Sequence, residues 1–448
     1  YGLDKWFKPE VNLKLNIKPI PGLNYQQVVG YENRQWELHQ YWPSTHRSEI
    51  DNSRKGHAHL AFSKTENLTS EGYFSYVKDF KGGHNLNATA GYSYFEVNGE
   101  NFGMDNYNFS VDGIKYWDIG QGSYLTDGKA GMSSGKSVTE RLFSFFARAN
   151  YSYQDKYMLS ASIRHEGSSK FAADNRWANF WSATAGWRIS NEEFMKDFDW
   201  LDDLKIRFGY GVTGNNDFSA TYMANMLGSD TNWMMPNGTW AYSYGKSQNV
   251  NPNLGWEEKK EWNLGVDYSF FEGRLYGKFD YYRREVDNLL FSVKVPQPPY
   301  TQGSQMQNIG SMESKGWEFE VGGDIIRTKD FTWSSSMNLS HNTGKILTLE
   351  GDNSYHNGNG FVAPGTPGDA ARMEAGSTIG SFYMWKFAGF DDEGSFLLYN
   401  KDGEVIPAAQ KTENDKQYIG NYTPKLIIGW SHTLTYKNFD LGINLRSW

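Results

Sequence analysis

The sequence contains no cysteine among its 448 residues. This absence excludes disulfide bonds and cysteine-ligated metal sites. No continuous apolar run reaches the roughly 18 residues that a membrane-spanning helix needs. Basic residues are outnumbered, with 44 Lys and Arg against 52 Asp and Glu, so the formal net charge is −8. A nucleic-acid partner is therefore not expected, because phosphate binding needs a basic surface.

Aliphatic core residues are scarce, whereas aromatic residues are abundant. Hydrophobic residues make up only 38% of the chain, yet aromatic residues reach 17% and glycine numbers 47. A buried globular core draws more heavily on Leu, Ile and Val. The composition suits a thin wall with one wet face, one dry face and aromatic girdles at its rims.

Segments of about ten residues with alternating polar and apolar side chains recur along the whole chain, a period that predicts β-strands. Ten residues is also about the length of a tilted strand that crosses a bilayer. In residues 147–167, "ARANYSYQDKYMLSASIRHEG", one face carries Tyr, Leu, Ala and Ile, and the other carries Arg, Ser and Asn. Further examples are "WSATAGWRIS", "EWNLGVDYSF", "GWEFEVGGDII" and "KLIIGWSHTLTYK".

Short and long connections alternate between these segments. Tight turns such as "PIPG", "KGG", "QDK", "EGR", "TKD" and "KN" join them in pairs, and the connection after Ser190 is expected to contain a helical turn. Every other connection is long. Outer-membrane barrels have this arrangement, with periplasmic turns and extracellular loops. We therefore predict an all-β chain that forms about 14 strands of a transmembrane antiparallel β-barrel with long extracellular loops.

The two faces of the predicted strands carry different side chains. Charged residues occupy mid-strand positions on the polar face, where a water-filled lumen would accept them: Arg148, Arg164, Arg188, Arg207, Glu318, Glu320 and Asp324. Aromatic residues lie near strand ends on the apolar face, where membrane interfaces favour them: Tyr153, Tyr157, Trp181, Trp187, Trp262 and Tyr436. The alternative is a large soluble sandwich or propeller with a Trp-rich core.

Six blocks of the sequence resemble the C-terminal barrel half of SusC/RagA-type TonB-dependent outer-membrane transporters, in the order found in that family. They are "YMLSASIRHEGSSKFAADNRWANFWSATAGWRISNEEFM", "LDDLKIRFGYGVTGNND", "NPNLGWEEKKEWNLGVDYSFFEGRLYGKFDYYRREVDNLL", "NIGSMESKGWEFEVGG", "GSTIGSFYMWKFAGFDDEG" and "IGNYTPKLIIGWSHTLTYKNFDL". These blocks cover most of residues 141–448. Residues 1–140 resemble the family more loosely.

The resemblance implies a barrel of about 22 strands in the bacterial outer membrane, in contact with its lipid. It also implies an N-terminal plug driven by the TonB complex, and a SusD-like surface lipoprotein that covers the barrel. We expect residues 1–448 to be part of one barrel domain, with the plug, the TonB box and the last strands outside this chain. The implied function is import of an oligosaccharide or peptide nutrient. The alternatives are a passive porin and a surface glycan-binding barrel without active transport.

No catalytic constellation is recognisable, so the chain is not expected to be an enzyme. The nine histidines are scattered, and neither a G-x-S-x-G elbow nor an H-E-x-x-H motif is present. A soluble glycosidase stays open as a further alternative, because sequence alone cannot show two carboxylates flanking a cleft. The oxygen-rich segments "DNSYHNGNG" and "DDEGSFLLYNKDGE" do not have EF-hand spacing, so solvated turns are expected there rather than calcium. No metal or other cofactor is predicted.

Aromatic residues in two predicted extracellular loops are the candidate ligand-binding residues. Flat aromatic faces stack on the C–H faces of sugars, and neighbouring amide side chains bond hydroxyl groups. The more frequent role of such residues is to pack a loop against its neighbours or against a covering subunit. The candidates are Trp233, Trp240, Tyr242 and Tyr244 in "SDTNWMMPNGTWAYSYGKS", with Tyr383 and Trp385 in "SFYMWKF".

Overall fold

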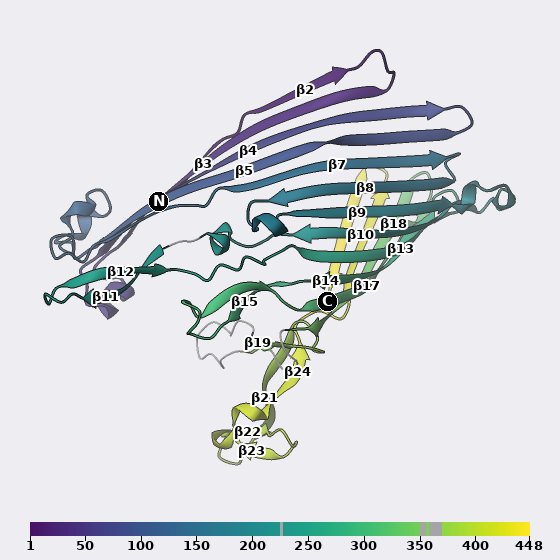
Figure 1. Ribbon diagram of the computed structural model, residues 1–448. Helices are drawn as coiled ribbons and strands as arrows, with labels where there is room; N and C mark the ends of the chain where they lie inside the picture. Colours follow the sequence, from purple (N-terminus) through teal and green to yellow (C-terminus); the bar gives the residue numbers. More distant parts are fainter. Residues whose placement is uncertain (225–226, 350–354, 358–369) are drawn as a thin grey trace.

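The computed structural model describes residues 1–224, 227–349, 355–357 and 370–448 (Figure 1). Its main feature is one large, curved antiparallel sheet, which we call the wall. In the described residues the wall contains sixteen strands in the order β1-β3-β4-β5-β7-β8-β9-β10-β13-β14-β17-β18-β25-β26, with β2 also pairing with β3 and β6 with β5. Because β1 and β2 share one edge of β3, and β6 and β7 share one edge of β5, these strands fill fourteen positions. The predicted fold and strand number are confirmed.

The wall strands are long, and β3, β4 and β5 are about twice as long as the ten-residue segments that the alternation predicted. Their bounds are β1 Gly2–Phe7, β2 Glu10–Asn16, β3 Leu23–Trp42, β4 His57–Phe80, β5 His84–Tyr107, β6 Gly131–Lys136, β7 Glu140–Tyr153, β8 Tyr157–Ser168, β9 Trp177–Arg188, β10 Leu201–Asn215, β13 Glu257–Phe270, β14 Leu275–Asp287, β17 Ser311–Arg327, β18 Phe331–Thr348, β25 Ile427–Tyr436 and β26 Phe439–Ser447.

Four smaller sheets and several short helices lie in the long connections. The small sheets contain β11 Leu227–Met234 with β12 Trp240–Lys246, β15 Leu290–Lys294 with β16 Ser304–Asn308, β19 Tyr355–Asn357 with β20 Arg372–Glu374, and β21 Ser381–Phe390 with β22 Phe396–Tyr399, β23 Val405–Pro407 and β24 Lys416–Asn421. The helices are α1 Arg47–Asp51, η1 Asp112–Ile114, η2 Ile119–Gln121, η3 Ala173–Asn175, η4 Ile189–Asn191, η5 Glu193–Met195, η6 Ala220–Met223, η7 Ala408–Gln410 and η8 Glu413–Asp415. None of the described helices is long and apolar enough to cross a membrane.

Tight turns lie at one end of the wall and long connections at the other (Figure 1). The "QDK" turn places Gln154 and Asp155 at positive φ, and the turn between β13 and β14 is held by Asp202. The carboxylate of Asp202 accepts hydrogen bonds from the backbone N–H groups of Glu272 and Gly273. The predicted helical turn after Ser190 is present as η4 and η5. The tight turns are therefore set partly by local backbone conformation, as in "QDK", and partly by contacts between neighbouring turns, as with Asp202.

The strand registers keep like residues on like faces. Ala161 on β8 lies opposite Ala183 on β9, whereas Ser162 lies opposite Ser182 on the reverse face. Trp177 and Trp187 mark the two ends of β9 on the apolar face, with Trp181 between them. The distance from Trp177 to Trp187 along the strand is the spacing expected of two membrane interfaces. We assign the apolar face to lipid and the polar face to the lumen, because a barrel in a bilayer buries apolar side chains outward.

The apolar outer band has a defined upper limit. On β3 the outward-facing positions from Leu23 to Tyr31 carry Leu, Val and Tyr and one amide, Gln27, which hydrogen-bonds Tyr25 and Ser70. This stretch of about nine residues is the span of a tilted bilayer-crossing strand. Directly above, outward-facing positions become charged and form ion pairs along a strand or between neighbouring strands. These pairs are Lys64–Glu66, Arg141–Glu96, Lys260–Asp287 and Arg283–Glu313. The upper parts of the long strands β3, β4 and β5 therefore extend beyond the bilayer.

At the turn end, one carboxylate holds the interfacial aromatic residues. Glu192 lies between η4 and η5 and accepts hydrogen bonds from Tyr157 Oη at 2.6 Å, Trp187 Nε1 at 3.1 Å and Lys156 Nζ at 3.1 Å. The bonds from Tyr157, Trp187 and Lys156 lower the pKa of Glu192. The polar ends of both aromatic rings thus meet a polar rim while their carbon atoms face the apolar band.

The fully buried apolar core lies at the loop end of the wall. Phe171, Phe180, Phe218, Leu254, Trp256 and Met306 form this core. Phe180 lies on the lumen face of β9, so these loops fold over the lumen side of the sheet. Trp256 donates a hydrogen bond from Nε1 to the carbonyl of Arg176 at 3.1 Å. Asn249 joins the same loops, because its Nδ2 donates to the carbonyls of Gln302 and Ser304.

The assignment of the two faces can be tested with adjacent residues on β13. Leu264 faces outward between Trp262 and Tyr268, and Asn263 faces the lumen. We expect Leu264→Arg in the full-length protein to lower the free energy of unfolding by about 2–4 kcal/mol, because arginine is costly at the bilayer midplane. Asn263→Arg is the control, with an expected change below about 1 kcal/mol. Urea unfolding in lipid vesicles measures both values, and equal losses would contradict the assignment.

Candidate functional site

A ladder of charged side chains crosses the lumen face from β10 to β17. Arg207 binds Asp267 with Nε–Oδ2 at 2.8 Å and Nη2–Oδ1 at 2.9 Å. The same guanidinium reaches Asp280, with both of its Nη atoms within 3.0 Å of the carboxylate oxygens. Lys278 continues the ladder to Glu320 at 3.1 Å. The planar guanidinium thus joins three adjacent strands through four hydrogen bonds.

This ladder depends on a glycine. Gly265 lies opposite Arg207 on β10 and opposite Asp280 on β14. A Cβ atom at position 265 would lie 2.5 Å from Arg207 Cζ, closer than such contacts allow. Because glycine has no side chain, position 265 on β13 leaves space for the Arg207 side chain to cross this strand and reach Asp280 on β14.

Not every lumen charge is neutralised by a neighbour. Arg148 on β7 is exposed and hydrogen-bonds only the amide oxygen of Asn150, at 3.2 Å, among the described residues. Glu318 on β17 is also exposed and has no ion-pair partner within the described ranges. Free charges on a wet wall keep the lumen surface hydrated.

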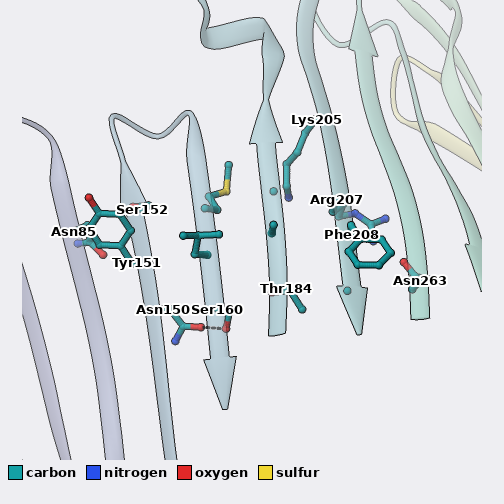
Figure 2. Close-up of a pocket in the computed structure, with 15 residues that line it drawn as sticks. Asn85, Asn150, Tyr151, Ser152, Ser160, Thr184, Lys205, Arg207, Phe208 and Asn263 are labelled. Carbon is teal, nitrogen blue, oxygen red and sulfur yellow. Dashed lines mark hydrogen bonds between the residues drawn. The ribbon is translucent and has the colours of Figure 1, made fainter. Parts of the chain in front are cut away.

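A shallow recess of about 420 Å³ opens on the lumen face across β5, β7, β8, β9 and β10 (Figure 2). Small polar side chains form its floor, among them Asn150 and Ser160, which share a hydrogen bond of 2.6 Å. Lys205 and Arg207 lie along one side of the recess in Figure 2. Both basic side chains are ion-paired, because Lys205 and Arg207 each contact Asp267 and Arg207 also contacts Asp280. The recess therefore offers mainly hydrogen-bonding groups and suits a polar segment or solute.

The first group of predicted aromatic residues lies on the hairpin of β11 and β12. Trp233, Trp240 and Tyr244 are 67%, 66% and 71% exposed. Tyr242 lies opposite Asn232 in the register of this hairpin; its side chain is outside the described part of the structure. The hairpin thus presents aromatic rings to solvent, as ligand stacking requires.

The second group, Tyr383 and Trp385, is used within its own sheet on β21. The ring of Tyr383 lies 5.1 Å from that of Tyr418. Trp385 donates from Nε1 to the carbonyl of Thr412 at 2.7 Å, and Lys416 lies 4.6 Å above its ring. These contacts favour the packing interpretation for this pair. Figure 1 shows the β11–β12 hairpin and the β21–β24 sheet at separate places on the wall.

Sequence reasoning missed a stack of side chains at the far end of β3, β4 and β5. The His57 ring lies between Trp42 at 4.5 Å and Tyr107 at 4.2 Å, and Arg54 covers the outer face of Tyr107 at 4.4 Å. Asp105 Oδ1 bonds His57 Nε2 at 2.7 Å. These residues come from three strands and a loop, so no single segment of sequence carries a signal for the stack.

The loop above this stack is held by Asp112. Its carboxylate accepts from the Ser44 backbone N–H at 2.9 Å, the Ser44 hydroxyl at 2.7 Å and Tyr41 Oη at 2.8 Å. The bonds from Ser44 and then from Tyr41 lower the pKa of Asp112. Burial and the nearby carboxylate raise the pKa of Tyr41. The contact therefore ties the segment after β3 to the segment after β5.

The described residues contain no group of three or more His, Cys, Asp or Glu side chains arranged to hold a metal. In residues 391–404 the polar side chains cap turns. Asp391 Oδ1 accepts from the N–H groups of Glu393 and Ser395, and Asn400 Oδ1 accepts from those of Asp402 and Glu404. The other oxygen-rich segment, residues 352–360, lies outside the described residues apart from β19.

The chain is similar to known outer-membrane proteins. The family model described as "TonB dependent receptor-like, beta-barrel" matches residues 10–446. The chain is 32% identical over 449 residues to TonB-dependent receptor P3 of Formosa agariphila. This alignment covers 95% of this chain and 42% of that protein. It is 34% identical over 333 residues to TonB-dependent receptor SusC of Bacteroides thetaiotaomicron. That alignment covers 72% of this chain and 32% of SusC.

Solved structures give the same result. A structure of the RagAB peptide transporter superposes on this chain with a TM-score of 0.81 and 25% identity. The superposition covers 99% of this chain and 48% of the transporter chain. The outer membrane transporter YddB from Escherichia coli matches 97% of this chain with a TM-score of 0.56 and 11% identity, which shows the fold alone. In each comparison the chain spans less than half the length of the relative.

The role of Gly265 can be tested by adding one methyl group. We expect Gly265→Ala to displace Arg207 and lower the free energy of unfolding of the full-length protein by about 1–3 kcal/mol. Gly429→Ala is the control, because a Cβ atom there meets only Asn338 Nδ2 at 3.9 Å. Its expected effect is within about 0.5 kcal/mol. Equal effects of the two substitutions in urea unfolding would contradict this role.

The Asp112 contact predicts a pH dependence. A carboxylate with a lowered pKa stabilises the fold above its ordinary value of 3.8, and that stabilisation is lost as the pH falls through the lowered pKa. Hydrogen-exchange protection of the Ser44 amide, corrected for the intrinsic rate, should decline over that range. The Gly99 amide is the control, because it donates to the uncharged Ser137 hydroxyl. Asp112→Asn should already weaken Ser44 protection at neutral pH.

Proposed function

Because the chain belongs to the TonB-dependent receptor-like β-barrel family, we propose that the full-length protein imports an oligosaccharide or peptide nutrient across the outer membrane. The observation that carries this proposal is the match of 99% of the chain to the RagAB peptide transporter with a TM-score of 0.81. The family transports and does not make or break covalent bonds, so the prediction that the chain is not an enzyme is confirmed. The wall lies in the outer membrane.

The other components of the proposed importer, which are further barrel strands, a plug and a covering lipoprotein, would belong to the rest of the protein or to its partners. Residues 1–448 would form part of one barrel domain. In the described residues, β1 and β2 pair only with β3, and β26 pairs only with β25, so strands from the rest of the chain can continue the sheet at both edges. An N-terminal plug would close the lumen and connect to the TonB complex. A SusD-like lipoprotein would cover the loop end.

In this mechanism the chain binds and guides the ligand. Ligand would be held at the loop end, with Trp233, Trp240, Tyr242 and Tyr244 as stacking surfaces. Tyr383 and Trp385 would shape the loop beside it. The loops joined by Asn249 and Trp256 would keep the mouth rigid while the plug moves. Below the mouth, the charged and amide side chains of the lumen face would keep the path hydrated.

Composition of the native assembly is the first test. The protein should be extracted from the outer membrane in mild detergent, purified and analysed by mass spectrometry. We expect a parent chain longer than 448 residues, with a plug segment and a lipoprotein of similar abundance. A lone chain of this size without a plug or partner would contradict the covered importer and favour a passive porin or a surface-binding barrel.

Energy dependence separates active import from passive diffusion. Cells that carry the protein should take up oligosaccharide or peptide mixtures only while the proton-motive force that drives TonB is intact. A matched strain without the protein is the control. Uptake that continues at the same rate after addition of an uncoupler would contradict the proposal, because a porin needs no energy.

The β11–β12 hairpin provides a test of ligand binding. We expect Trp233→Ala and Trp240→Ala each to weaken ligand binding by about 1–3 kcal/mol, because each substitution removes an aromatic ring that would stack on the ligand. Trp117→Ala is the matched control, because Trp117 is also exposed at the loop end but lies outside the hairpin. Binding is measured by calorimetry with the ligand identified from uptake. If the two hairpin variants bind the ligand as tightly as the Trp117→Ala control, the hairpin is not part of the binding site.

A further inference from the structure

Three exposed phenylalanines form a cluster on the β21–β22 hairpin, separate from the aromatic residues discussed above. Phe387, Phe390 and Phe396 are 52%, 59% and 59% exposed. Their ring centroids lie 5.1–6.0 Å apart. With about 200 Å² for a phenylalanine side chain, these fractions leave roughly 340 Å² of apolar surface in contact with water, the size of a functional patch.

The backbone is built to bring these rings together. Phe390 lies directly opposite Phe396, whereas Phe387 lies three residues earlier on β21 and would face the other side of a regular strand. A register shift between Phe387 and Gly389 inserts one extra residue. This bulge turns Phe387 onto the same face as Phe390. Gly389 provides the unusual backbone conformation, with φ of 140°.

The hairpin that carries the cluster is also held rigid. Asp391 Oδ1 accepts from the N–H groups of Glu393 at 3.0 Å and Ser395 at 2.8 Å. Gly394, at φ of 83°, completes the turn. The rings are therefore fixed in place before any partner arrives, which lowers the entropy lost on binding.

The position and the rim of the cluster indicate the kind of partner. Figure 1 shows β22 and β23 at the tip of a module that projects from the wall, away from its turn end. Asp391, Asp392 and Glu393 follow Phe390 directly in the sequence, so an acidic edge borders the apolar centre. An apolar centre with a polar rim is the usual build of a protein–protein interface.

We propose that Phe387, Phe390 and Phe396 dock the covering lipoprotein, by inserting into an apolar pocket on that partner with basic residues around it. This inference rests on the proposed function, because it takes the covering lipoprotein as its occupant. The cluster would form the centre of an interface of about 800 Å² per partner, the usual size for a specific complex. The hairpin would thus serve as a fixed point of attachment, distinct from the ligand-binding aromatic residues.

The direct test is photo-crosslinking in the native outer membrane. Phe396 in the full-length protein is replaced by p-benzoylphenylalanine, which closely resembles the native side chain in shape. We expect a crosslink to the lipoprotein that co-purifies with the wild-type protein, at a peptide that contains Lys or Arg. Phe194 is the control position, because it is exposed on η5 at the turn end and should not label that partner. A crosslink to a second copy of this chain, or to lipid alone, would overturn the proposal.

Two variants measure the contribution of the surface. The triple variant Phe387→Ala, Phe390→Ala and Phe396→Ala should co-purify with at least tenfold less lipoprotein than the wild-type protein does. Asp392→Lys leaves the rings and the Asp391 turn intact and should lower retention several-fold, with a smaller effect at high salt. Heat-modifiable mobility on gels confirms that each barrel is folded.

The outcomes separate this inference from the proposed function. If no lipoprotein co-purifies with the wild-type protein, the covered importer itself fails. If the lipoprotein co-purifies but both variants retain it at the wild-type level, only the docking surface fails. Loss of retention in both variants, with folded barrels, supports the proposal.

Discussion

The structure depends on one constraint, which is that backbone N–H and C=O groups inside a bilayer have no water to bond. Antiparallel pairing satisfies these groups through fourteen consecutive positions of the wall. Because side chains alternate along each strand, the same pairing fixes which residues face lipid and which face the lumen. A one-residue slip would exchange the two faces, so the register carries the membrane topology as well as the stability.

The lumen face shows how this wall holds charge in water. Arg207 pairs with Asp267 and Asp280 on neighbouring strands, and Lys205 brings a second positive charge to Asp267. Gly265 leaves the space that the guanidinium crosses. The free charges of Arg148 and Glu318 remain open to solvent. The wall is therefore stiffened by bidentate pairs while its surface stays wet.

The loop end is built differently, from a buried apolar core, loops tied by side chains and separate small sheets. Trp256 and the apolar residues around it form a buried core over the lumen face, and Asp112 ties two loops beyond β3 and β5. The β11–β12 hairpin and the β21–β24 sheet lie at separate places at this end and carry exposed aromatic residues. Rigid modules of this kind can present distinct surfaces to a ligand and to a partner without changing the wall beneath them.

The sequence by itself determined the strands, the turns and the two faces. Alternation over about ten residues and short turns such as "QDK" are local signals, and each reflects backbone geometry within a few residues. Only the tertiary structure decided that Gly265 lies beneath Arg207, that His57 is stacked between Trp42 and Tyr107, and that a bulge unites Phe387 with Phe390 and Phe396. These groupings depend on register between strands that are distant in sequence, or on one inserted residue. Alternation alone does not fix either of them, because it is the same for every register that differs by two residues.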